Sequence, residues 1–304
     1  ESFRQLKGPM IDLRTPKEFA QGHWPGATNV PLFNDEERAK IGKTYKEEGQ
    51  VKAISLGLKI ISPKLATLIR EVRAIKEQKD YASNPTNPSY LKFYCWRGGM
   101  RSSSVAWLSN ILELKPVLLL GGYKSYRNWT LRQFKKKWPL KLIGGKTGSG
   151  KTDLILLLRK KGFSILDLEG LANHRGSSFG SLGLPSQPST EQYENKIVEI
   201  LEEFKNNKNK EIFVEAESAN LGHCRIPFEL FKQMKVAPMI EITRTQEERI
   251  NKLVEVYGTQ NQKMLEEATS RIYKRLGPQR TNEALRAIKE QNWAEACKAI
   301  LEYY

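Results

Sequence analysis

One short segment in the middle of the chain constrains the fold more than any other feature. The sequence GKTGSGKT at 145–152 matches the pattern G-x-x-x-x-G-K-[ST] at every fixed position. It follows an apolar run at 140–143 that predicts a strand, and it precedes a segment at 152–160 that predicts a helix. The motif therefore predicts an α/β domain that binds a diphosphate, and it does not by itself predict hydrolysis of ATP.

The individual residues of this loop have separate expected roles. The backbone N–H groups between Gly145 and Lys151 would surround the diphosphate, Lys151 would neutralise its outer oxygens, and Thr152 would bind Mg²⁺ if a metal is present. The predicted diphosphate-binding residues are Gly145, Thr147, Gly148, Ser149, Gly150, Lys151 and Thr152.

Alternating strand and helix patterns extend this α/β domain over 139–245. After the helix at 152–160 the pattern predicts a helix at 190–206 and strands at 164–168, 211–214 and 238–242. The remainder, 246–304, has the apolar spacing of successive amphipathic helices. These helices are expected at 246–257, 262–276, 282–290 and 293–304.

The first part of the chain, 1–138, predicts another α/β domain. Its expected strands are at 10–13, 91–95 and 116–120, and its expected helices are at 16–21, 63–78, 101–112 and 123–137, with a polar loop at 82–89. Pro139 disfavours helical geometry in the residue before it, so the boundary between the two domains is placed near Trp138.

A cysteine loop, CWRGGMRS at 95–102, lies between a predicted strand and a predicted helix. Backbone N–H groups and the helix N-terminus can surround one anion there, which would stabilise a thiolate at Cys95 and bind a phosphate-like oxyanion. Arg97 and Arg101 would add positive charge, and Gly98 and Gly99 would permit the tight curvature. Two alternatives stay open: a buried structural thiol, and the C-x₅-R loop of a cysteine phosphatase.

Composition favours a soluble protein with a polyanionic partner. Fifty Lys and Arg against 34 Asp and Glu give a formal charge of +16 among 304 residues. A charge of this sign and size favours nucleic acid as the partner. No apolar run approaches the roughly 20 residues that cross a bilayer. The three cysteines, Cys95, Cys224 and Cys297, form no C-x-x-C pair, which predicts no metal site and favours the reducing cytoplasm.

Two basic segments are the predicted nucleic-acid contacts. The helix at 123–137 carries Lys124, Arg127, Arg132, Lys135, Lys136 and Lys137 together with Tyr123, Tyr126 and Trp129. The C-terminal part carries Arg271, Lys274, Arg275 and Arg280. Basic side chains would bind phosphates and aromatic side chains would stack on an extruded base, unless these are ordinary solvated basic faces.

Acidic and polar residues near two strand ends complete the candidate site. Glu215 and Glu217 follow the predicted strand at 211–214, where an acidic partner of a phosphate loop often lies; the alternative is a solvated carboxylate at a strand end. The loop after the strand at 164–168 supplies Glu169, His174, Arg175, Ser177 and Ser178. The Gly-, Ser- and Pro-rich stretch 176–189 is expected to be a mobile loop over a site.

Several sequence blocks resemble known families. DLRTPKEF at 12–19 and GHWPGATNVP at 22–31, together with the cysteine loop, resemble rhodanese domains, in which His23 would belong to a structural turn. DLEGLANHRGSSFG at 167–180 resembles the hallmark of bacterial tRNA 2-selenouridine synthases. Four other blocks resemble parts of the same family: FYCWRGGMR at 93–101, GGKTGSGKT at 144–152, EAES at 215–218 and LGPQRT at 276–281. The blocks follow one another over nearly the whole chain.

This resemblance implies a fold, a reaction and partners. It implies a rhodanese-like domain followed by a P-loop α/β domain with a helical C-terminal region. The implied substrate is 5-substituted 2-thiouridine at the wobble position of the tRNAs for Lys, Glu and Gln. Geranyl diphosphate would first S-geranylate it, and selenophosphate from a donor system would then replace sulfur with selenium. No tightly bound cofactor is implied.

The implied division of labour sets one structural requirement. The phosphate loop would hold the diphosphate of the geranyl donor, and the Cys95 loop would handle selenophosphate. An apolar slot near the phosphate loop would then be needed for the geranyl chain, with Phe179, Leu182 and Leu184 as candidates to cover it.

Two other functions stay possible from the sequence. A P-loop nucleotide kinase or NTPase with a rhodanese-fold regulatory module would turn over ATP, although the residues at 168–180 match no kinase pattern. A non-catalytic RNA-binding protein is supported by the charge alone and opposed by two complete anion-binding loops. The sequence does not predict the oligomeric state.

Overall fold

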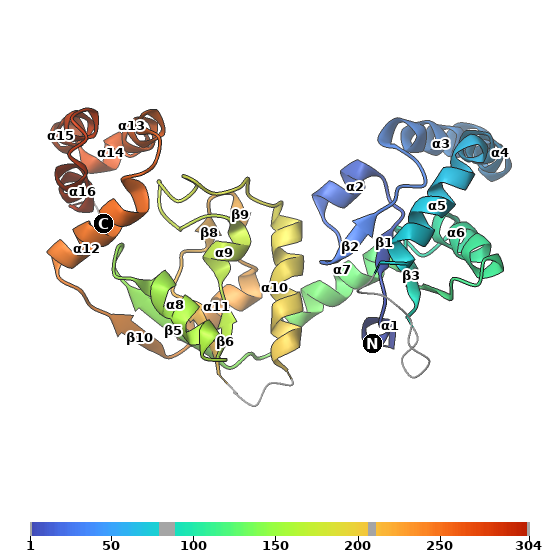
Figure 1. Cartoon of the computed structure of the whole chain (residues 1–304), viewed down its shortest axis with the longest axis horizontal. Helices are drawn as coiled ribbons and strands as arrows, with labels where there is room; N and C mark the ends of the chain where they lie inside the picture. The colour runs from blue at the N-terminus through green and yellow to red at the C-terminus, as the bar shows by residue number, and fades with distance from the viewer. Residues whose placement is uncertain (1, 79–88, 206–210, 303–304) are drawn as a thin grey trace. The chain divides into compact units, whose positions relative to one another are not determined.

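The computed structural model describes residues 2–78, 89–205 and 211–302. The chain divides into two compact units, 1–132 and 133–304, and each has α/β architecture with its own parallel sheet (Figure 1). The α/β fold class predicted from the sequence is therefore confirmed. The predicted polar loop at 82–89 lies, apart from Ser89, outside the described residues.

The sheet of the first unit has the order β2-β1-β3-β4 with all neighbours parallel. Its strands are β1 (Met10–Asp12), β2 (Ala27–Asn29), β3 (Leu91–Tyr94) and β4 (Pro116–Leu118). β1 and β3 are central, and Ile11 and Phe93 on them are fully buried. The sequence predicted three of these four strands; β2 is only three residues long and follows the turn at 22–26.

The helices of this unit begin where the sequence provides caps. The Thr15 hydroxyl accepts a hydrogen bond from Glu18 N–H, and the Glu18 carboxylate accepts one from Thr15 N–H. This capping box starts the helix at Pro16, as predicted. The helices are α1 (Ser2–Gln5), α2 (Pro16–Gln21), α3 (Asp35–Glu48), α4 (Gln50–Ile61), α5 (Leu65–Lys76), α6 (Met100–Ile111) and α7 (Gly122–Gln133), with a 3-10 turn η1 (Ser62–Lys64) before α5.

Two long helices, α3 and α4, were not predicted. α3 has no buried residue, so it lacks the apolar stripe by which the sequence would reveal it. Its start was nevertheless encoded, because Asn34 and Glu37 form a second capping box. The helix predicted at 63–78 begins instead as the 3-10 turn, which contains Pro63.

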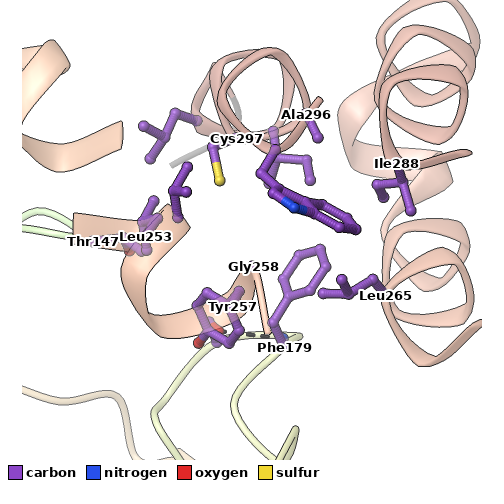
Figure 2. A pocket seen from close by; sticks show the side chains of 14 residues that line it. Thr147, Phe179, Leu253, Tyr257, Gly258, Leu265, Ile288, Ala296 and Cys297 are labelled. Carbon is purple, nitrogen blue, oxygen red and sulfur yellow. Dashed lines mark hydrogen bonds between the residues drawn. The ribbon is translucent and has the colours of Figure 1, made fainter. Parts of the chain in front are cut away.

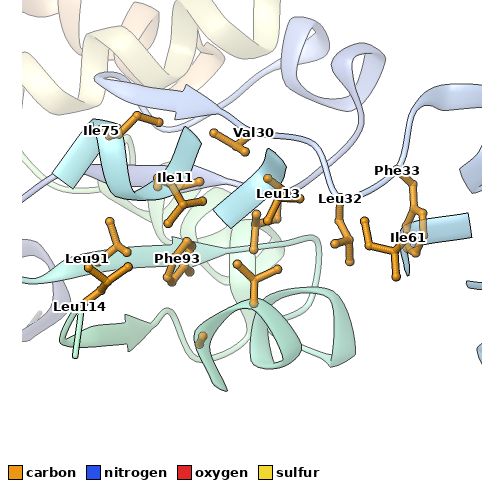
Figure 3. Packing of buried hydrophobic residues seen from close by; sticks show 14 residues of the cluster. Ile11, Leu13, Val30, Leu32, Phe33, Ile61, Ile75, Leu91, Phe93 and Leu114 are labelled. Atoms are coloured by element: carbon orange, nitrogen blue, oxygen red, sulfur yellow. The ribbon is translucent and has the colours of Figure 1, made fainter. Parts of the chain in front are cut away.

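The first unit has a hydrophobic core on one face of its sheet and an aromatic cluster. In the core, Ile11, Leu91 and Phe93 from the sheet pack near Ile75 of α5 (Figure 3). The same cluster includes Val72 of α5 and Val105 of α6. The aromatic cluster consists of Phe3, Trp24, Tyr94, Tyr123 and Tyr126. Its ring stacking includes a Trp24–Tyr126 pair with centroids 4.2 Å apart.

The second unit has a parallel sheet in the order β10-β5-β7-β6. Its strands are β5 (Leu140–Gly145), β6 (Ser164–Leu166), β7 (Ile212–Glu215) and β10 (Met239–Ile242), and a small antiparallel hairpin pairs β8 (Asn220–Leu221) with β9 (Cys224–Arg225). All four sheet strands were predicted within two residues. Because β5 and β7 are adjacent and parallel, the phosphate loop and Glu215 lie at the same sheet edge.

The helices of this unit cover the sheet and form a C-terminal bundle. They are α8 (Lys151–Lys160), α9 (Leu168–Ala172), α10 (Thr190–Phe204), α11 (Phe228–Val236), α12 (Gln246–Tyr257), α13 (Gln262–Arg271), α14 (Tyr273–Leu276), α15 (Pro278–Lys289) and α16 (Trp293–Leu301). The helix predicted at 262–276 is two helices, interrupted at Ile272, whose ψ of 5° is not helical.

The basic helix predicted at 123–137 ends early, at Gln133. Gln233 of α11 explains the change in direction, because its side-chain amide donates to the carbonyls of Phe134 and Lys136 and accepts the N–H of Trp138. Trp138 also donates its indole N–H to Gln133 O. These long-range bonds replace the missing helical turn. Among the described residues, no helix is both long and apolar enough to cross a membrane.

Candidate active site

The phosphate loop follows β5 and leads directly into α8, as the motif requires. Gly145, Gly148 and Gly150 have φ values of 147°, 82° and 85°, in the region that favours glycine. A Cβ on Gly145 would lie 2.5 Å from Ser149 Oγ, so the loop is also tightly closed. Lys151 Nζ donates to Gly145 O at 2.9 Å, which holds the ammonium group across the loop. The predicted loop residues are thus brought together.

Four acidic residues that follow or end β6 and β7 lie close enough to interact electrostatically, and Glu169 and Glu217 also interact with Lys151 of the phosphate loop. Thr152 donates its hydroxyl to Glu169 Oε2 at 3.4 Å, and Glu169 and Glu217 are hydrogen-bonded to each other. Glu215 is fully buried and accepts the N–H of Leu168. Asp167 accepts the N–H of Gly170 and thereby caps α9. The alternative of solvated strand-end carboxylates is wrong for Glu215, since β7 carries it into the interior.

Burial raises the pKa values of three of these acids, Glu169, Glu215 and Glu217. Desolvation, followed by the charges of Asp167, Glu169 and Glu217, raises the pKa of Glu215 to about 9. Desolvation and the charge of Glu217 raise the pKa of Glu169 to about 8, although Lys151 opposes this. The pKa of Glu217 is raised as well, chiefly by desolvation. Near neutral pH the cluster therefore retains protons that could be transferred to a bound substrate.

The residues available to a metal are few. Thr152 offers a hydroxyl oxygen, and Glu169 would offer a carboxylate oxygen once a bound cation displaced its proton; oxygen is the donor type that Mg²⁺ prefers. Across residues 2–78, 89–205 and 211–302, no three His, Cys, Asp or Glu side chains are grouped so as to hold an ion. A Mg²⁺ ion here would depend on phosphate oxygens and water for the rest of its coordination.

Helix α12 packs against the phosphate loop from about a hundred residues further along the chain. Arg249 Nε donates to Thr147 O at 2.8 Å, and a Cβ on Gly148 would lie 2.8 Å from Arg249 O. Arg249 itself is buried. Sequence reasoning missed this residue, because nothing around 246–257 distinguishes it from an ordinary amphipathic helix.

The loop at 173–189 connects the acidic cluster to the C-terminal helices. A Cβ on Gly176 would lie 2.5 Å from Glu217 Oε2. His174 Nδ1 accepts the N–H of Gly176, and burial lowers the pKa of His174. Arg175 donates to Leu182 O at 2.8 Å and lies over the ring of Tyr257. The loop is irregular, and these contacts attach it to both sides of the site.

The two adjacent serines of this loop, Ser177 and Ser178, make different contacts. Ser177 accepts the N–H of Phe179 through its hydroxyl. The carbonyl of Ser178 accepts a hydrogen bond from Arg271 of α13 at 3.4 Å. One residue predicted to bind nucleic acid, Arg271, thus contacts the predicted substrate loop.

In the first unit, Cys95 follows β3 and precedes α6, as predicted. The side chain is buried, with its sulfur 3.2 Å from Ser102 Oγ. Gly98, with φ 68°, lies against the chain after β4, where a Cβ would be 2.8 Å from Leu119 O. The N–H of Tyr123, at the start of α7, donates to Cys95 O. The GlyGly pair at 121–122, where this helix begins, was the available signal for this contact, because a Cβ on Gly122 would lie 2.4 Å from Cys95 O, and sequence reasoning did not use it.

The two arginines of the cysteine loop differ. Arg97 is exposed beside the loop. Arg101 instead forms a 2.8 Å ion pair with Glu18. Burial alone would raise the pKa of Glu18, but the hydrogen bond and charge of Arg101, together with Thr15 N–H and the charge of Arg14, lower that pKa. Arg101 therefore links the loop to α2, and Arg97 has the greater freedom to meet an incoming anion.

The aromatic residues proposed for base stacking need a correction. Tyr123 and Tyr126 are buried in the aromatic cluster and cannot stack on an RNA base. Trp129 is half-buried and packs on Tyr126. His23 lies in a turn, where its ring stacks on Phe19 and its Nδ1 is 2.9 Å from Phe19 O. The structural interpretation of His23 fits this geometry.

Most of the predicted basic residues are exposed. Those with exposed side chains are Lys124, Arg132, Lys135, Lys136, Lys137, Arg271, Lys274, Arg275 and Arg280, and Arg127 is half-buried. Lys136 forms an ion pair with Glu202, and Arg280 forms one with Glu302. They belong to both units, so the positive charge is not confined to one domain.

The loops and sheets described above define a class of protein in which a rhodanese-like domain precedes a P-loop domain. Residues 2–128 match the family model of the rhodanese-like domain. Residues 138–302 match the model described as the tRNA 2-selenouridine synthase AAA domain. The chain therefore belongs to the tRNA 2-selenouridine synthase family.

Curated relatives agree over most of the length. A tRNA 2-selenouridine synthase of Sulfurovum sp. (strain NBC37-1) is 37% identical over 97% of this chain and 85% of that protein. One of Pseudomonas putida (strain GB-1) is 36% identical over 95% of this chain and 82% of its own. One of Alcanivorax borkumensis is 39% identical over 82% of this chain and 66% of its own.

Proposed function

We propose that this chain is a tRNA 2-selenouridine synthase that uses geranyl diphosphate and selenophosphate in two steps. Membership of the family supports the overall conversion of 2-thiouridine to 2-selenouridine. The single observation that supports the two-step scheme is the presence of two separate strand–loop–helix turns of the kind that bind anions, one around Lys151 and one around Cys95. A kinase or NTPase would need only the first.

The first step is alkylation of sulfur. The sulfur of the wobble 2-thiouridine attacks the first carbon of geranyl diphosphate, the carbon–oxygen bond breaks, and diphosphate leaves with the electron pair while the base loses its N3 proton. The loop N–H groups and Lys151 stabilise the negative charge that develops on the diphosphate. Thr152 and Glu169 could hold a Mg²⁺ ion, which would supply further charge neutralisation.

The second step replaces sulfur with selenium. The selenium of selenophosphate adds at C2 of the base, and the S-geranyl group leaves as a thiol after it gains a proton. Attack of water on phosphorus then breaks the phosphorus–selenium bond and releases phosphate, leaving 2-selenouridine. Alkylation in the first step makes this possible, because a thiol leaves far more readily than sulfide. Arg97 and the backbone of the Cys95 loop would bind the selenophosphate oxygens.

The substrate would be the tRNAs for Lys, Glu and Gln, bound through the exposed basic residues. Phosphate contacts would supply the affinity, and extrusion of the wobble base would supply access to the sulfur. The selenophosphate donor system is the partner that this scheme requires.

The test is mass spectrometry of the wobble nucleoside after incubation of 2-thiouridine tRNA with the protein. Geranyl diphosphate alone should give the S-geranyl product, and added selenophosphate should convert it to the seleno product. Lys151→Ala should lose at least about a hundredfold in geranylation, because the developing diphosphate charge is no longer neutralised. Lys146→Ala, at an exposed position of the same loop, is the matched control and should geranylate normally.

Cys95→Ser should still geranylate but should not introduce selenium, with buried Cys224→Ser as its control. Equal loss of both steps in both Lys151→Ala and Cys95→Ser would contradict the division of labour. An unchanged nucleoside, with fresh donors and tRNA bound, would instead favour the kinase or the RNA-binding alternative, and ATP turnover would separate those two.

A further inference from the structure

An apolar cavity lies in the second unit between the phosphate loop and the C-terminal helices (Figure 2). Its volume is about 50 Å³, and most of its lining residues come from α12 and α16. They include Leu253 and Val254 of α12, Trp293 and Ile300 of α16, and Phe179 of the loop at 173–189. The lining is almost wholly hydrocarbon, so the cavity has little to offer a polar ligand.

One end of the cavity reaches the phosphate loop itself. Thr147, within the diphosphate-binding motif, and Ser177 are lining residues. Arg249 holds the Thr147 carbonyl, and a Cβ on Gly148 would lie 3.1 Å from Leu253 Cγ. Leu253 therefore contacts the phosphate loop and lines the cavity as well. A molecule with its diphosphate in the loop would need only a short reach to place an attached group in this cavity.

The far end is enclosed by the C-terminal core. Phe179, Leu265 and Ile288 are buried in one hydrophobic cluster, and the rings of Phe179 and Tyr257 are 6.0 Å apart. Leu182, which was expected to cover such a slot, belongs to the same cluster but does not line the cavity, and Leu184 is half-buried elsewhere on the loop. Of the three candidate residues, only Phe179 lines the cavity.

We infer that this cavity binds the hydrocarbon tail of the prenyl diphosphate whose diphosphate group occupies the phosphate loop. The inference rests on the proposed function, which requires a donor with a charged head and an apolar tail. The cavity provides the two surroundings in the right order: a loop of N–H donors at one end and buried aromatic and aliphatic side chains at the other. Burial of each methylene in such a site favours binding by several-fold.

The size of the cavity adds a constraint on the tail. The enclosed space of about 50 Å³ is small for a ten-carbon tail, so lining side chains such as the half-buried Leu253 and Ile300 would have to move to admit it.

The experiment measures binding by titration calorimetry, with geranyl diphosphate and inorganic diphosphate as the two probes. Wild-type protein should bind geranyl diphosphate at least about tenfold more tightly, because the tail is buried. Val254→Phe fills the cavity and should abolish that difference while inorganic diphosphate binds as before. Val256→Phe makes the same change on the same helix at a position outside the lining, and it should keep the difference.

The outcomes separate this inference from the proposed function. Equal affinity of the wild-type protein for the two probes, or an unchanged difference in Val254→Phe, would overturn the cavity assignment even if the tRNA is geranylated. A tail-dependent affinity that only Val254→Phe removes would support the assignment even if no nucleoside product forms. Thermal unfolding of both variants should show that each is folded before the comparison is made.

Discussion

Glu215 illustrates how much a single side chain depends on its surroundings. The sequence shows an acid at the end of a strand, whereas the fold buries it completely beside Asp167, Glu169 and Glu217. Within the described part of the chain, its Oε1 has no hydrogen-bond partner, although Oε2 accepts the N–H of Leu168. A group in this environment is far more stable protonated than ionised.

This burial makes stability depend on pH. An unfolded Glu215 ionises near 4.5, while the folded group keeps its proton until about pH 9 because its pKa is raised. The folded state binds more protons between those values, so the free energy of unfolding falls as pH rises through them.

Glu215→Gln removes the ionisable group but keeps an acceptor for Leu168 N–H. The midpoint of thermal unfolding should therefore fall less between pH 6 and pH 9, and at pH 8.5 it should exceed the wild-type value by at least about 2–4 °C, or about 1 kcal/mol. Glu211→Gln, at an exposed position beside the same strand, should follow the wild-type curve. Parallel curves for all three proteins would contradict a buried, protonated Glu215.

Among the helices and strands, α12 has a contact that its sequence did not predict: it packs on the phosphate loop. Its capping box, Thr245 with Glu248, fixes where it begins, and the sequence predicted both of its ends. Its contact with the phosphate loop could not be predicted, because Arg249 and Thr147 are 102 residues apart. The helix both supports the loop and supplies a wall of the apolar cavity.

A pair of glycines tests this contact. Gly148 and Gly162 have nearly the same φ, 82° and 84°, but a Cβ meets α12 at Gly148 and nothing within 4 Å at Gly162. Both substitutions to alanine incur backbone strain of about 1 kcal/mol. Gly148→Ala should in addition displace α12 and weaken inorganic diphosphate binding roughly tenfold, as measured by calorimetry. If Gly162→Ala weakens binding equally, the packing of α12 on the loop is not what matters.

At the scale of the whole molecule, the dominant property is positive charge. The formal charge of +16 is distributed over exposed side chains in both units. When Lys and Arg side chains bind the phosphates of a nucleic acid, they release the counterions condensed on it. The affinity for tRNA should therefore fall steeply as the salt concentration rises. It supplies binding without sequence preference, and selection of the wobble base must come from the sites themselves.

Replacement of exposed basic residues should therefore change the salt dependence. Lys124→Ala, Lys135→Ala and Arg271→Ala should each weaken tRNA binding and reduce the slope of log affinity against log salt by about one, if each contacts one phosphate. Filter binding at several salt concentrations gives the slope. Slopes equal to that of the wild-type protein would exclude these residues from the RNA contact.

Local sequence determined the class of fold, the positions of the two loops predicted to bind anions, and most helix and strand positions. Their information lies within a few neighbouring residues: glycines that adopt positive φ, apolar spacing of strands and helices, and caps such as Thr15 with Glu18. The sequence did not predict helix α3, because none of its side chains is buried. The end of α7 was predicted wrongly, because Gln233, far along the chain, donates hydrogen bonds to the carbonyls of Phe134 and Lys136, which follow the helix.

Only the tertiary structure decided what surrounds those loops. It buried Glu215, paired Arg101 with Glu18, removed Tyr123 and Tyr126 from the surface, and built an apolar cavity from Thr147, Phe179 and the C-terminal helices. Each of these outcomes depends on desolvation and contact between residues distant in sequence. A local pattern of residue types carries no information about such contacts, since they exist only once the chain has packed.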